Sequence, residues 1–224
     1  MNDFQHDPIV LPLDPEFLTE AGLPFACALL RAVKGVRELH LLHVIPPRAQ
    51  RSDVSQLAAA RRQLERVARQ VRARVNEPAI HREVRSGDLV ETIVDAVRSL
   101  GSAELVLAPM PQRRRELVAK LVERLDVPIF VVPSEADSEV AVLQRLVAAS
   151  SQERTQQRLL GALEVLADAW GAEVETRPRE HVEGADLIAL PQSEWGESLP
   201  PAPVLLLPVQ DLTSAGGASL VPSA

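Results

Sequence analysis

Residues 79–133 restrict the possible fold more than any other part of the sequence. The segments 104–109 and 128–133 are short apolar runs without polar alternation, as expected of strands that are covered on both faces. Residues 90–100, before the first run, and residues 117–125, between the two runs, repeat apolar side chains at helical spacing. Parallel strands require crossover connections, which are usually helices and right-handed. The stretch therefore predicts a doubly wound α/β unit.

The preceding residues continue the same alternation. They indicate strands at 9–13 and 39–47 and helices at 16–34 and 57–75. Asp14 closes the first strand and is placed to cap the helix that follows. Gly22 and Pro24 interrupt that helix, so it either kinks or begins late. With residues 79–133, this predicts a mainly parallel five-stranded sheet with helices on both faces.

This order of elements resembles a universal stress protein domain over residues 8–133. The resemblance rests on the second strand and its exit, LLHVIPP, on Gly87-Asp88 before a helix, and on Gly101 at the end of that helix. The strands ELVL and PIFVV then follow in the order typical of the family. The implied fold is the doubly wound sheet of the nucleotide-binding α-hydrolase-like proteins.

After a polar linker at residues 134–139, the sequence repeats the same order of strands and helices in a shorter form. The segment GADLIALP repeats GSAELVLAP, and PAPVLLLP repeats DVPIFVVP. Ser150 and Glu153 form a capping-box pattern before a helix. We therefore expect a complete domain at 1–133, a reduced copy of about four strands and one helix at 140–209, and a disordered tail at 210–224.

In the family that the chain resembles, fifth strands pair antiparallel, either across dimers or between tandem repeats. The resemblance implies that residues 128–132 and 203–207 join the two copies into one sheet. Such pairing would cover two sheet edges that would otherwise be free to associate. The sequence also permits a further homodimer, and it leaves the protein partner unidentified.

Nucleotide-binding members of the family hold adenine with an Asp at the end of the first strand and a Val in the second strand. They hold ribose and phosphates with a loop of the form G-x2-G-x9-G-(S/T). Asp14 and Val44 match the adenine positions, but Pro109 stands where the first glycine belongs, and residues 102–160 contain no glycine. A phosphate loop needs closely approaching backbone N–H groups, which prolines do not have. We expect that ATP binding is lost and that no cofactor is held.

Two interpretations stay open for Arg113, Arg114 and Arg115, which precede the helix at 117–125. Three cations at a helix N-terminus oppose the helix dipole, and a bound anion or an acidic partner would relieve that cost. The alternative is a solvated charge run balanced by neighbouring glutamates. Asp14 has two interpretations as well, a helix cap or a nucleotide ligand.

Composition excludes several classes of function. The chain has 24 basic and 31 acidic residues and a net charge of −7, which argues against nucleic acid as the main partner. No apolar run reaches the roughly 20 residues of a membrane span, so we expect no membrane insertion. The single cysteine, Cys27, agrees with a reducing compartment, and we expect a cytoplasmic location.

No catalytic or metal centre is visible in the sequence. His40 and His43 lie three apart on one strand and face opposite sides of the sheet. His6, His81 and His181 are scattered, without another His or Cys at ligand spacing. The nucleophile and phosphate-loop motifs of common enzyme classes do not occur. We expect neither a metal site nor an enzymatic activity.

The resemblance implies a stress-response or regulatory binding module that acts through protein contacts. One alternative is an adenine-nucleotide (ATP or AMP) sensor that uses Asp14 and Val44 with a phosphate site at Arg113, Arg114 and Arg115. Another is an accessory domain for a transporter or a kinase. Affinity for nucleotide, and its loss on Asp14→Ala, separates the sensor from the nucleotide-independent module.

Overall fold

The computed structural model describes residues 7–14, 17–32, 38–47, 53–101, 103–133, 143–195 and 202–208. The expected linker and C-terminal tail lie outside these residues. The first half contains β1 (Ile9–Leu13), α1 (Gly22–Ala32), β2 (Glu38–Ile45), α2 (Asp53–Arg72), β3 (Ala79–Ser86), α3 (Leu89–Leu100), β4 (Glu104–Leu107), α4 (Arg114–Val122) and β5 (Ile129–Val131). The second half contains β6 (Arg145–Ala149), α5 (Glu153–Trp170), β7 (Glu173–Arg177), the 3₁₀ turn η2 (Arg179–His181), β8 (Leu187–Pro191), the 3₁₀ turn η3 (Gln192–Glu194) and β9 (Val204–Leu207).

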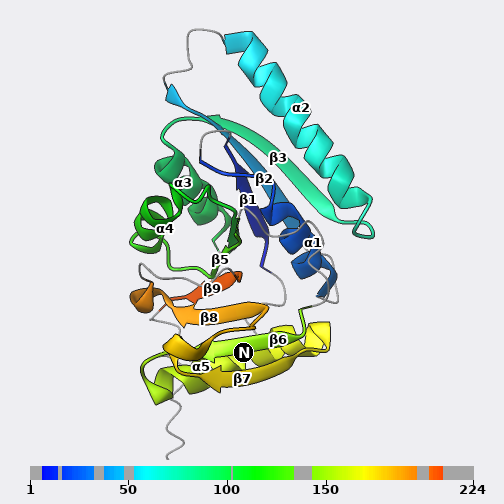
Figure 1. Ribbon diagram of the computed structural model, residues 1–224. Helices are drawn as coiled ribbons and strands as arrows, with labels where there is room; N and C mark the ends of the chain where they lie inside the picture. Colours follow the sequence, from blue (N-terminus) through cyan, green and yellow to red (C-terminus); the bar gives the residue numbers. More distant parts are fainter. Residues whose placement is uncertain are drawn as a thin grey trace, which may run out of the picture.

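The nine strands of the described residues belong to one sheet, in the order β3-β2-β1-β4-β5-β9-β8-β6-β7 (Figure 1). Each neighbouring pair is parallel except β5 and β9, which are antiparallel with Phe130 opposite Leu205. The doubly wound α/β fold is therefore confirmed. The expected pairing of residues 128–132 with 203–207 is confirmed too, and it makes the two parallel parts a single sheet.

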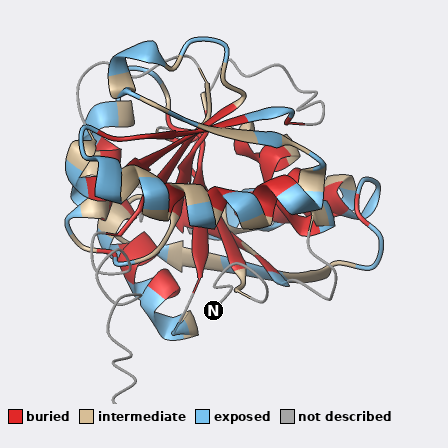
Figure 2. Cartoon of the chain, turned by 90° about the horizontal axis from the view of Figure 1, so that it is seen from below, coloured by how far each residue is buried: buried red, intermediate tan, exposed pale blue. Residues whose placement is uncertain are grey.

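Two apolar layers sandwich the sheet. On one face, side chains of α1, α2 and α5 pack on the strands, and on the other face α3 and α4 do so. Figure 2 shows the strands buried between helices whose outer surfaces are exposed. In the described part of the chain, no helix combines the length and the apolar character needed to cross a membrane.

Asp88 and Gly101 set the two ends of α3, and the end at Gly101 is the one that the sequence predicts. The Oδ1 atom of Asp88 accepts hydrogen bonds from the backbone N–H groups of Val90 (3.0 Å) and Glu91 (3.1 Å). Gly101 ends the helix with φ +77°, in the left-handed range that glycine adopts without strain. These residues carry part of the resemblance, and their roles here are structural.

The first helix begins later than the cap at Asp14 implies. α1 begins at Gly22, where an added Cβ would lie 3.2 Å from Leu11 Cδ1, so glycine lets the first turn approach the sheet closely. Pro24 then falls within the first turn, where a missing N–H costs no intrahelical bond. The expectation that Asp14 caps α1 is wrong, because the chain first makes a separate turn.

On the face of the sheet opposite α5, ion pairs and a tryptophan take the place of helices. No helix among the described residues covers β6 and β7 there. Glu175 of β7 lies 3.8 Å from Arg145 and 2.7 Å from Arg177, measured between carboxylate and guanidinium atoms. Trp195 packs against the apolar cluster of this face.

Phe130 tests whether the two halves unfold together. It is fully buried in β5, and its ring lies 5.3 Å from that of Phe25. We expect Phe130→Ala to lower the free energy of unfolding by about 3–5 kcal/mol. Both tryptophans, Trp170 and Trp195, lie in the second half, so urea unfolding followed by fluorescence should shift as much as unfolding followed by circular dichroism.

The matched control is Val54→Ala, at a side chain that is 83% exposed. It should change the free energy of unfolding by less than about 0.5 kcal/mol. If fluorescence of the Phe130→Ala protein were unshifted while circular dichroism shifted, the halves would unfold independently and the joined sheet would not be one cooperative unit.

Candidate functional site

The topology of the sheet places the expected site. In doubly wound sheets, ligands bind outside the carboxyl ends of the strands, at the point where the strand order reverses. The chain runs from β1 outward to β2 and β3, and from β4 outward to β5, so one switch point lies between β1 and β4. A second lies between β6 and β8, since β7 flanks β6 and β9 flanks β8.

The chain closes the first switch point with its own backbone. The loops that follow β1 and β4 are joined by two hydrogen bonds, from Thr19 N to Ala108 O (2.9 Å) and from Met110 N to Phe17 O (2.9 Å). Between these bonded residues, Pro109 contributes no N–H group. The backbone donors of Thr19 and Met110 are therefore used within the chain, and Pro109 has none to offer.

Asp14 also takes part in this closure. It is 2% exposed, and its Oδ1 atom accepts a hydrogen bond of 2.8 Å from the backbone N–H of Phe17. Val44 is fully buried and packs on the face covered by α3 and α4. The two expected adenine residues thus lie in the interior, with the Asp14 carboxylate fixing the turn after β1.

The structure does not bring Arg113, Arg114 and Arg115 together at one point. The guanidinium carbon of Arg113 lies 5.1 Å from the ring centroid of Phe17, a cation–π contact across the closed loops. Arg114 points inward, and its Nε and one terminal nitrogen are buried without a hydrogen-bond partner among the described residues. Burial lowers the pKa of Arg114, while Arg115 is exposed.

At the second switch point, an internal carboxylate occupies the carboxyl end of β6. Glu194 of η3 accepts hydrogen bonds from the Ser150 hydroxyl (2.5 Å), the Ser151 hydroxyl (3.1 Å) and the Ser151 backbone N–H (3.2 Å). The expected capping box of Ser150 with Glu153 is therefore wrong. Ser150 pairs with a glutamate brought in by the fold, 44 residues away along the chain.

Comparisons with known proteins identify the fold. No protein-family model matches the sequence, and the search of curated proteins finds no relative. A universal stress protein of Archaeoglobus fulgidus superposes with a TM-score of 0.68 and 15% identity, over 93% of this chain and 99% of that one. The chain has the universal stress protein fold. A Pseudomonas aeruginosa protein assigned to the same group superposes with a TM-score of 0.62 and 12% identity, over 94% and 97% of the two chains.

Within this universal stress protein fold, one polar residue beside Asp14 was missed by sequence reasoning. His43 of β2 lies in register with Leu13, the residue before Asp14. It is 7% exposed, and its Nδ1 atom is buried without a hydrogen-bond partner among the described residues. Burial lowers the pKa of His43, and the nearby Asp14 carboxylate opposes that shift. The apolar run around His43 did not indicate that this side chain lies near Asp14, because only the strand register brings the two residues together.

The buried His43 predicts a pH-dependent stability. Its pKa in the folded protein lies below the value of about 6.5 expected for an unfolded chain. Near that pH, the unfolded state therefore binds a proton more readily than the folded state does. The free energy of unfolding should therefore fall as the pH drops through about 6.5. Urea unfolding between pH 7.5 and 5.5 measures this fall, and His43→Gln should make it shallower.

His181 supplies the control because it is an exposed histidine on η2. His181→Gln should leave the pH dependence of the wild type unchanged. An equal slope in the wild-type and His43→Gln proteins would show that the neutral state of His43 contributes nothing to folding.

Proposed function

We propose that the chain is a non-enzymatic, nucleotide-independent binding module of the stress-response or regulatory type. One observation carries this proposal: the chain's own groups occupy both switch points of the sheet. Backbone hydrogen bonds join the loops after β1 and β4, and the Glu194 carboxylate occupies the end of β6. A protein that has closed its ligand crevices from within is better suited to act through its surface.

Electrostatics at the second switch point supports the same proposal. A phosphate needs free N–H or hydroxyl donors and a favourable potential. Here Ser150 and Ser151 already donate to a carboxylate, so an incoming anion would have to displace Glu194 and approach its negative charge. At the first switch point, Pro109 and Pro111 flank Met110, whose N–H is used. These described donors at the two ends are therefore used within the chain.

The proposal also includes an interpretation of the second half of the chain. We interpret β6, α5, β7, β8 and β9 as a reduced second copy of the first domain, which keeps the strands needed for the joint with β5. A module of this kind would act through a protein partner, and a homodimer is one form of such contact. The proposal includes a cytoplasmic location, supported by the single cysteine, Cys27, which is buried in α1.

Nucleotide content tests the proposal directly. The purified protein is denatured, and the supernatant is analysed for released nucleotide. ATP and AMP are then titrated with Mg²⁺ by calorimetry, beside a nucleotide-binding universal stress protein as positive control. We expect no released nucleotide and no binding heat at millimolar ligand, since Thr19, Met110, Ser150 and Ser151 already use their donors within the chain. Binding that is lost in Asp14→Ala would contradict the proposal and favour a nucleotide sensor.

A second candidate function, anion sensing at the N-terminus of α4, is favoured by Arg114. Its Nε and one terminal nitrogen are buried without an acceptor among the described residues, an arrangement that costs free energy. A phosphate group that reached this guanidinium would supply the acceptor. The state of the protein would then follow the concentration of the anion, as in a sensor.

Arg114→Met separates the two candidates. Without an anion, the variant should be as stable as the wild type or more stable by about 1 kcal/mol, because a buried group without a partner is removed. If α4 senses an anion, millimolar phosphate or ATP should raise the melting temperature of the wild type and of Arg115→Met, the exposed matched control, but not of Arg114→Met. Equal melting temperatures with and without anion in all three proteins would exclude the second candidate.

A further inference from the structure

Three potential metal ligands converge on one face of β2 and β3, away from both switch points. Glu38 and His40 are two residues apart on β2, so they project from the same face. His81 of β3 lies in register with His40 on the neighbouring parallel strand. The sequence gave no sign of this cluster, because His81 follows His40 by 41 positions and only the strand register brings the two together. The expectation that His81 is isolated is wrong.

The distances within the cluster match those between the ligands of one small cation. The Oε2 atom of Glu38 lies 3.2 Å from His40 Nε2 and 3.5 Å from His81 Nε2. Two atoms that each lie about 2.05 Å from a tetrahedral zinc ion are separated by about 3.3 Å. The ligand atoms of all three residues fall within 4.8 Å of one another.

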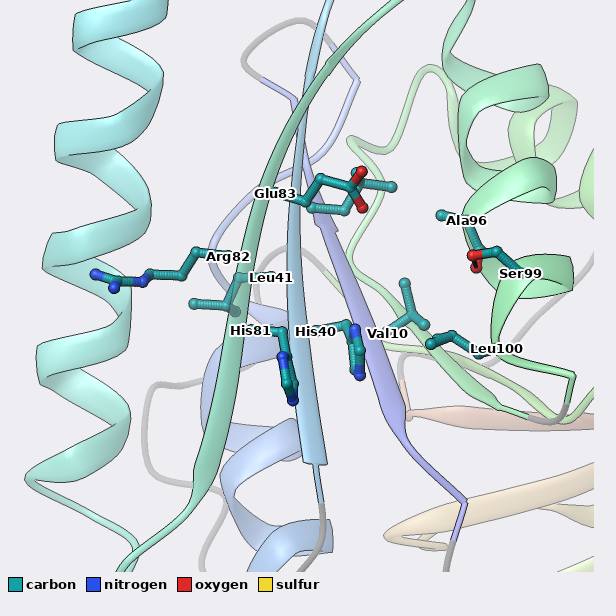
Figure 3. A pocket seen from close by; sticks show the side chains of 10 residues that line it. Val10, His40, Leu41, His81, Arg82, Glu83, Ala96, Ser99 and Leu100 are labelled. Carbon is teal, nitrogen blue, oxygen red and sulfur yellow. Dashed lines mark hydrogen bonds between the residues drawn. The ribbon is translucent and has the colours of Figure 1, made fainter.

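The two imidazole rings are already aligned. They stack with centroids 4.4 Å apart and an angle of 17° between their planes, and Figure 3 shows them extending side by side from β2 and β3. Two imidazole nitrogens, one from each strand, approach the same carboxylate oxygen of Glu38. An ion between the three groups would bind both nitrogens and the oxygen at once.

A cavity beside the cluster gives access to it. It has a volume of about 350 Å³ and lies between β2, β3 and the last turns of α3, with Ser99 and Leu100 in its wall (Figure 3). His40 and His81 line it, and their side chains are 22% and 55% exposed. Glu83, in the same wall, is held 2.7 Å from Arg85 and is therefore engaged elsewhere.

We propose that Glu38, His40 and His81 form a binding site for a divalent transition-metal ion, with Zn²⁺ as the preferred ion. Two imidazoles and one carboxylate are a ligand set that suits zinc, and three protein ligands leave one position of a tetrahedral site for water or an added ligand. The bound ion would link β3, the edge strand of the sheet, to its neighbour β2. This site does not depend on the function proposed above.

The test uses the full chain, freed of metal with a chelator and dialysed. Zn²⁺ is titrated at pH 7.5 in competition with a chromogenic chelator. We expect the wild type to bind one equivalent of Zn²⁺. In His81→Ala the affinity should fall at least about tenfold, because the loss of a residue that only supports a metal ligand already costs about that much. Glu38→Gln should weaken binding as well, since its neutral amide is a poorer ligand for zinc.

His181→Ala is the matched control because it removes an exposed histidine far from β3 in the sequence. It should bind Zn²⁺ as the wild type does. Co²⁺ gives a second measurement: the wild type should show the visible absorption of four-coordinate Co²⁺, and His81→Ala should not. Zn²⁺ should also raise the melting temperature of the wild type but not of His81→Ala.

Three results would overturn the proposal. They are the absence of stoichiometric Zn²⁺ binding, equal affinities of the wild type and His81→Ala, and a loss in His181→Ala as large as in His81→Ala. Melting curves without metal show whether each variant is folded. His81 is more than half exposed at the edge of the sheet, so its truncation should leave the metal-free stability almost unchanged.

Discussion

The antiparallel pairing of β5 with β9 is the contact on which the rest of the architecture depends. A parallel sheet ends in edge strands with unpaired backbone groups, and each half of this chain would have one at β5 or β9. Their pairing places both strands in the interior of a nine-stranded sheet, where every residue of both strands is buried. The core of the second half therefore continues directly into that of the first half.

At both switch points, groups of the chain form hydrogen bonds with the loops at the ends of the strands, where a ligand would bind in a doubly wound sheet. At one of them, the loops after β1 and β4 satisfy each other's backbone groups, and Arg113 covers Phe17. At the other, Glu194 takes the hydroxyl and N–H donors at the end of β6. Donors and acceptors paired within the protein no longer need an external partner. At both switch points, the described donors thus contribute to the stability of the fold.

Sequence patterns predicted most of the fold because they report local structure and burial. The order of the elements and the end of α3 at Gly101 could be read in this way, whereas the joint between β5 and β9 was implied by the family resemblance. The patterns failed where two distant segments meet. Ser150 pairs with Glu194 instead of Glu153, and His40 meets His81, because strand register and loop path decide these contacts. The candidate metal ligands were therefore visible as residues but not as a group.

The charged side chains on β6 and β7 determine how this face of the sheet meets its surroundings. A sheet face that loses its helix normally exposes apolar side chains and becomes adhesive. Here Arg145, Glu175 and Arg177 form ion pairs on that face, while Val147 and Ala149 of β6 are buried on it. Anything that does dock there would be held mainly by charge, and physiological salt screens exposed charges beyond about 8 Å. Contact at this face would be brief, reversible and sensitive to ionic strength.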